Sequence, residues 1–111
     1  MLPLSDQPLP CELTVDQRGA RLLLNGDVTI ADALKVHEEA MRALALGVPM
    51  QIDLSNVTYL DAAMLQLLAA IQRAAASSRI LVSVQHAAQP LLQDAQLMGM
   101  KGILSEDQES A

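Results

Sequence analysis

Residues 51–73, QIDLSNVTYLDAAMLQLLAAIQR, decide how this chain folds. They begin within an apolar run, 50–54, whose length is typical of a buried parallel strand. A short polar segment over 55–60 follows. Asp61 then stands where a helix would begin, because its carboxylate can accept the free backbone N–H groups of a first turn. The apolar residues after it recur every three or four positions and predict a helix that ends at 77–78; they are Met64, Leu67, Leu68, Ile71 and Ala75.

Working outward, residues 11–16 and 20–25 read as two strands joined by a turn at 17–19, which predicts a hairpin closed by Gly26. Thr29 or Asp32 can cap a helix that runs to Gly47. The buried stripe predicted for this helix is Ala33, Leu34, Val36, Ala40, Met41 and Leu44, with Lys35, Glu38, Glu39 and Arg42 outside it. Residues 79–85 alternate as a strand, and 89–98 form a last helix with Pro90 in its first turn.

The predicted order is β-β-α-β-α-β-α, which places the chain in the α/β class. Strand-helix-strand units of this length favour parallel pairing with right-handed connections, so we expect a mixed sheet with helices packed on it. Residues 1–10 read as an irregular lead-in rich in proline, 11–104 as a single domain, and 105–111 as a polar tail.

Composition excludes several classes of function. The net charge is −6, from 13 acidic and 7 basic residues, which argues against nucleic acid and anionic membranes as partners. Tyr59 is the only aromatic residue, so stacking platforms for bases are missing. Cys11 is the only cysteine, which rules out an internal disulfide. Without a signal-like N-terminus or a long apolar run, we expect a soluble cytoplasmic protein with no membrane insertion.

The strand, polar bend and Asp61 helix resemble the central segment of STAS domains, the module of anti-sigma factor antagonists and of sulfate-transporter tails. The resemblance covers about residues 11–104. In that family the helix usually opens with Asp-Ser-Ser-Gly or Asp-Thr-Ala-Gly, and a hydroxyl there is the phosphorylation switch. Here the residues are Asp61, Ala62, Ala63 and Met64. Alanine has no group that accepts a phosphoryl, so Ala62 and Ala63 form a degenerate phosphorylation site.

The resemblance also implies a protein-binding surface around the start of this helix. Gly26 and the residues after it match a family segment near the switch, although Thr29 stands where kinase-regulated antagonists carry an acid. The outward side of the Asp61 helix should present small and polar side chains, with Leu65 toward one margin. The predicted partner-binding residues are Asp27, Thr29, Ser55, Asn56, Thr58, Asp61, Ala62, Ala63, Met64, Gln66, Ala70 and Arg73.

The resemblance therefore implies a non-enzymatic interaction module of bacterial signalling. It would resemble an anti-sigma factor antagonist that binds a kinase-type regulator without phosphorylation control at the usual site. Short stand-alone STAS proteins also serve as subunits of phospholipid-transporting ABC systems, where they bind the ATPase, and this alternative remains open.

A third alternative, from another class, is a domain that binds a nucleotide or another small ligand. The chain has no Gly-rich loop to cradle a phosphate, which weighs against it. His37 and His86 lie far apart without metal-ligand spacing, so no metal or other cofactor is predicted. The hydroxyls of Ser55 and Thr58 are alternative phosphorylation sites, although loop hydroxyls more often form turns.

Overall fold

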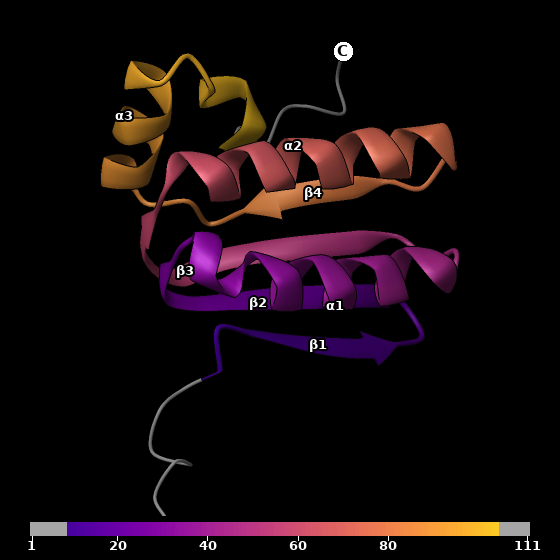
Figure 1. Ribbon diagram of the computed structural model, residues 1–111. Coiled ribbons are helices and arrows are strands. Elements are labelled where there is room, and N and C mark those ends of the chain that lie inside the picture. The colour runs from indigo at the N-terminus through magenta and orange to yellow at the C-terminus, as the bar shows by residue number, and fades with distance from the viewer. Residues whose placement is uncertain (1–8, 105–111) are drawn as a thin grey trace, which may run out of the picture.

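The computed structural model describes residues 9–104 and shows an α/β fold built on one mixed sheet (Figure 1). The strands are β1 (Cys11–Asp16), β2 (Gly19–Val28), β3 (Met50–Leu60) and β4 (Val82–Gln85). The helices are α1 (Ala33–Ala45), α2 (Ala62–Ser77) and α3 (Gln89–Leu97), and the 3-10 turns are η2 (Ile30–Asp32) and η3 (Lys101–Leu104). The predicted β-β-α-β-α-β-α order is confirmed. The expected tail at 105–111 and residues 1–8 of the expected lead-in lie outside the described residues.

The sheet has the strand order β1-β2-β3-β4. β1 pairs antiparallel with β2, and β2 with β3 and β3 with β4 pair parallel. Two right-handed crossovers that step in the same direction place their helices on the same face of a sheet. Figure 1 shows α1 and α2 side by side over that face, with α3 and η3 beyond α2. The apolar core lies between this helix pair and the sheet.

The predicted polar bend at 55–60 is wrong, because β3 continues through it to Leu60. β2 likewise extends past Gly26 to Val28 and pairs with this second half of β3, with two register shifts along the way. In this second half of β3, the side chains of Val57 and Leu60 are buried in the apolar core, which a polar bend would not allow. In contrast, the strand expected at 79–85 begins only at Val82.

The buried stripe of α1 differs from the predicted one at three positions, one of which is Ala43, a completely buried residue that the prediction left out. Leu34 was expected inside and is 71% exposed, because it lies in the first turn of the helix, right after η2. Glu39 was expected outside and is 7% exposed. Its carboxylate is covered by Lys35 at 3.1 Å and Arg42 at 3.1 Å, one on either side along the helix. These two cations, Lys35 first, hold the pKa of Glu39 below its usual value despite its burial.

The β1–β2 turn lies at the end of the sheet opposite to the starts of α1 and α2 (Figure 1). Gly19 follows this turn with φ +143°, a region that side chains strongly disfavour. The next residue, Ala20, donates its N–H to the carbonyl oxygen of Pro49 at 2.8 Å. A Cβ on Gly19 would lie 2.5 Å from that same oxygen. Glycine at position 19 is therefore what lets the hairpin approach the α1–β3 connection.

Cys11 opens β1 and is 2% exposed under α1. Burial raises the pKa of its thiol, and the negative charge of Glu39 raises it further. The thiol is therefore neutral and covered in the folded protein.

Asp53 is a charged residue in the middle of β3 that is only 2% exposed. The guanidinium of Arg21 on β2 pairs with its Oδ2, and the backbone N–H of Ser55 donates to its Oδ1 at 2.9 Å. Burial raises the pKa of Asp53, but the hydrogen bonds from Arg21 and Ser55 outweigh burial and hold the pKa below its usual value. Asp53 thus stabilises the fold only while it is ionised.

This arrangement predicts an acid-sensitive contribution to stability. It is complete above the ordinary aspartate pKa of about 3.9 and is lost as pH falls through the lower pKa of the folded state. We expect Asp53→Asn to lower stability at pH 7 and to flatten the loss of stability below about pH 4. Urea unfolding at a series of pH values measures both effects, with the exposed Asp94→Asn as the control. An Asp53→Asn protein as acid-sensitive as the wild type would contradict this role.

Candidate docking site at the start of helix α2

The site lies at the edge of the sheet where β2 and β3 end. Parallel strands present their carboxyl ends at the same edge, so the segments that follow them must meet there. β2 leads into η2 and α1, and β3 leads into α2. Figure 1 shows both helices starting at this edge, on the left of the view. Residues about 30 positions apart in the sequence are thereby brought together.

The carboxylate of Asp61 connects the two segments. Its Oδ1 accepts the backbone N–H of Met64 at 2.9 Å, which caps α2, and its Oδ2 accepts the backbone N–H of Ile30 at 2.9 Å. The predicted cap is confirmed, and the bond to Ile30 adds a second role that the sequence did not predict. One side chain therefore fixes the position of η2 relative to the first turn of α2.

Thr29 and Asp32 stabilise the η2 side of the site. The Thr29 hydroxyl accepts the N–H of Ala31 at 3.3 Å, and the Asp32 carboxylate accepts the N–H of Thr29 at 3.1 Å. Each predicted cap thus accepts a backbone N–H of this turn. The turn needs both groups because its first N–H groups have no partner within the helix.

Two side-chain pairs join the ends of β2 and β3. Thr58 donates its hydroxyl to Asp27 Oδ1 at 2.6 Å, and Asn56 donates its amide to Asn25 Oδ1 at 3.1 Å. The structure therefore brings together the predicted residues Asp27, Thr58 and Asp61 along one edge. Ser55, by contrast, is next to the buried Asp53 and contacts it through its backbone.

The face of α2 that points away from the sheet is small and polar, as predicted. Ala62, Gln66, Ala70 and Arg73 are exposed, and Ala63 is half-buried. Leu65 is 1% exposed and belongs to the core, so the expectation that it lies toward a margin is wrong.

Met64 does not fit the role predicted for it. Its side chain is completely buried and packs in the core, so it cannot belong to a partner-binding surface. Met64 lies on the same face of α2 as the buried Leu68 and Ile71, at helical spacing. Its side chain therefore belongs to the core beneath the docking site.

Ile30 and Leu34 are residues of this edge that the sequence analysis did not assign to the site, and Leu34 was expected to be buried. Ile30 is 69% exposed in η2 and Leu34 is 71% exposed in the first turn of α1. The capping pattern Thr29-x-x-Asp32 is the signal that could have indicated a helical start at residue 30.

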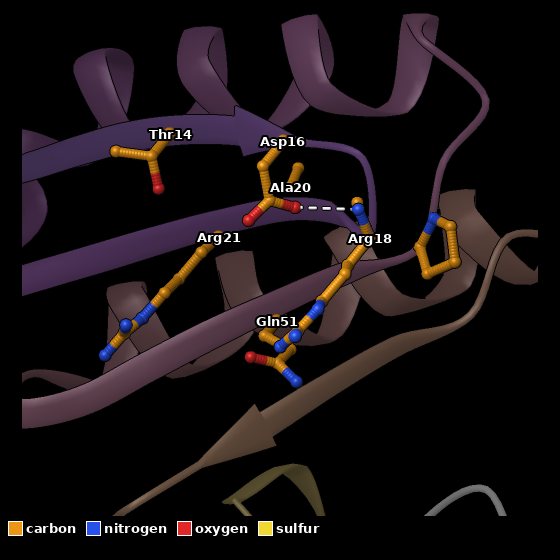
Figure 2. A pocket seen from close by; sticks show the side chains of 8 residues that line it. Thr14, Asp16, Arg18, Ala20, Arg21 and Gln51 are labelled. Carbon is orange, nitrogen blue, oxygen red and sulfur yellow. Dashed lines mark hydrogen bonds between the residues drawn. The ribbon is translucent and has the colours of Figure 1, made fainter.

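A separate hollow of about 320 Å³ lies at the other end of the sheet (Figure 2). The side chains labelled there include Thr14, Asp16, Arg18 and Gln51, and Asp16 accepts the backbone N–H of Arg18 at 2.8 Å. None of the predicted partner-binding residues lines it.

Two features are absent from residues 9–104. Over this range, no three His, Cys, Asp or Glu side chains lie close enough together to hold a metal ion. None of the helices described there has both the length and the apolar character needed to cross a membrane.

The chain matches the family described as "Mlab, STAS domain" over residues 11–105. It belongs to the STAS family. The mixed sheet and its helices are thus those of a STAS domain, and the resemblance drawn from the sequence is confirmed.

Solved structures agree with this assignment. The STAS domain resembles the crystal structure of a candidate anti-sigma factor antagonist from Thermotoga maritima, with a TM-score of 0.73 and 16% identity, covering 86% of this chain and 83% of that one. It also resembles the crystal structure of a protein named Mglu, with a TM-score of 0.64 and 16% identity over 72% of this chain, but it spans only 20% of that chain. At these identities the likeness shows the fold. Curated protein sequences give no significant match.

Proposed function

We propose that this STAS domain is a non-enzymatic docking module of bacterial signalling, acting in the cytoplasm, that binds a kinase-type regulator. Its docking face comprises Asp27, Thr29, Thr58, Asp61, Ala62 and Gln66. The observation that carries the proposal is the Asp61 carboxylate, which joins η2 to α2 through Ile30 and Met64. A surface held in one conformation before binding loses little conformational entropy when a partner docks.

The chemistry of the docking face supports permanent binding. Ala62 is exposed at the first turn of α2 and bears no hydroxyl, so no phosphate can be placed there. A phosphate would bring three oxygens and about −1.5 to −2 charges next to Asp61, where a partner would otherwise pack against a methyl group. We infer that the face stays in the state of an unphosphorylated antagonist.

Ala62→Glu tests this proposal by replacing the methyl group with a longer side chain that prevents a partner from approaching the helix closely. Glutamate is favourable in the first turn of a helix, so the fold should remain as stable as the wild type. We expect partner binding to weaken at least tenfold, which corresponds to about 1.4 kcal/mol. The measurement is affinity capture of the tagged chain from its native host, read by mass spectrometry, followed by titration with the recovered protein.

Ala76→Glu is the matched control, because Ala76 is exposed on the same helix about 20 Å from Ala62. Recovery of a kinase-type protein by the wild type and Ala76→Glu, but not by Ala62→Glu, supports the proposal. Equal recovery by all three proteins would show that the partner docks elsewhere.

A second candidate is the STAS subunit of a phospholipid-transporting ABC system that binds its ATPase. The observation that favours it is again the missing hydroxyl at Ala62 and Ala63, because a permanent subunit needs no phosphate switch. The same capture experiment distinguishes the two. A stable complex with an ABC ATPase, lost with Ala62→Glu, assigns the docking face to lipid transport.

A further inference from the structure

Ile30 and Leu34 form an apolar patch that adjoins the docking face. Ile30 is 69% exposed in η2, and Leu34 is 71% exposed in the first turn of α1. The backbone N–H of Ile30 is hydrogen-bonded to Asp61, so the patch is fixed beside the start of α2. A single exposed leucine is ordinary, but two large exposed apolar side chains four residues apart, next to a rigid polar face, indicate a contact surface.

The charges around the apolar patch are mainly negative. Residues 27–38 and 58–66 contain four acids, Asp27, Asp32, Glu38 and Asp61, and one base, Lys35. Lys35 and Arg42 share the carboxylate of Glu39 at 3.1 Å each, so with Glu39 and Arg42 included five acids stand against two bases. The patch is therefore an apolar centre within an acidic rim.

We propose that the occupant of this patch is an amphipathic helix of the partner protein, whose leucine-like side chains are flanked by arginine or lysine. This inference rests on the proposed function and specifies the chemistry of the partner. Apolar side chains on such a helix would cover Ile30 and Leu34, and its cations would face the acidic rim. A second copy of this chain fits poorly, because both copies carry a net charge of −6 and an acidic rim, and these like charges repel.

The test uses two synthetic helical peptides with the same leucine pattern, one carrying lysine and the other glutamate at the polar positions. Each is titrated into the ¹⁵N-labelled chain, and the amide shifts of residues 27–38 and 58–66 are followed. We expect the lysine peptide to shift these amides and to bind more weakly as salt is raised, because the rim charges are screened. The glutamate peptide should produce no comparable shifts.

Ile30→Ser and Leu34→Ser should each weaken binding of the lysine peptide about tenfold, as expected for central apolar contacts. Leu81→Ser is the matched control, because Leu81 is an exposed leucine at the opposite end of α2 and should leave binding unchanged. Equal binding of both peptides, shifts located elsewhere, or equal affinity of Ile30→Ser and Leu34→Ser with the wild type would overturn the proposal. Sedimentation would also overturn it if the wild type were a dimer and Ile30→Ser and Leu34→Ser were monomers.

Failure here and failure of the proposed function are distinguishable. If Ala62→Glu loses the partner while Ile30→Ser and Leu34→Ser retain it, the docking face is supported and the apolar patch is not part of the interface. If the lysine peptide binds at the patch while Ala62→Glu retains the partner, the patch is supported and the start of α2 is not part of the interface.

Discussion

We expect Met64→Gly to lower the free energy of unfolding by roughly 4 kcal/mol. Glycine is the residue usual at this position in the STAS helix start that the sequence resembles. Met64 is completely buried in the core, so the change removes a whole apolar side chain and leaves a cavity. Truncating a buried methionine to alanine costs about 2–5 kcal/mol, and glycine in a helix costs about 1 kcal/mol more. A domain of this size has about 5–15 kcal/mol in total, so the variant is close to unfolding.

Urea unfolding followed by circular dichroism measures this loss. Ala63→Gly is the control, since it places the same glycine one position earlier at a half-buried site. Its expected cost is about 1 kcal/mol, from backbone entropy alone. Similar losses for the two variants would show that the Met64 side chain does not support the core.

The second large effect is expected at the opposite end of the sheet, where Gly19→Ala should destabilise the fold by about 3 kcal/mol. The new Cβ would lie 2.5 Å from the carbonyl oxygen of Pro49, and alanine disfavours the φ of +143°. The backbone must shift to relieve both, and the hydrogen bond from Ala20 to Pro49 is lost or weakened with it.

Thermal unfolding is a suitable measurement, because a loss of about 3 kcal/mol lowers Tm by more than 10 °C in a domain of this length. Gly102→Ala is the control. A Cβ at position 102 meets nothing within 4 Å, so Tm should barely change. A Gly19→Ala protein as stable as the Gly102→Ala protein would mean that the hairpin end tolerates the displacement.

The sequence was sufficient to predict the order of the elements and the pairing of β1 with β2. Those features follow from short-range patterns, such as the alternation in 11–16 and the apolar period after Asp61. The length of β3 was not predictable in this way. Its second half, 55–60, is polar at three of six positions, and it is extended because β2 pairs with it from 25 to 28. Such pairing depends on residues about 30 positions away.

The candidate site was predicted in part for the same reason. Asp61 and Ala62 were found because a helix cap and its first turn are local features. The exposure of Leu34 depends on where the preceding η2 turn places the start of α1, which periodicity alone does not give. Glu39 is the opposite case, a charged residue that was expected outside and is buried. Its burial depends on Lys35 and Arg42, which pair with its carboxylate.

The thiol of Cys11 can be used as a chemical probe of the opening of strand β1. Its covered, neutral thiol can react with a disulfide reagent only when β1 leaves α1, since a thiolate in contact with water is the reactive species. The rate of labelling in the native state therefore reports how often the edge strand detaches. Comparing that rate with the rate of global unfolding distinguishes local opening of β1 from loss of the whole core.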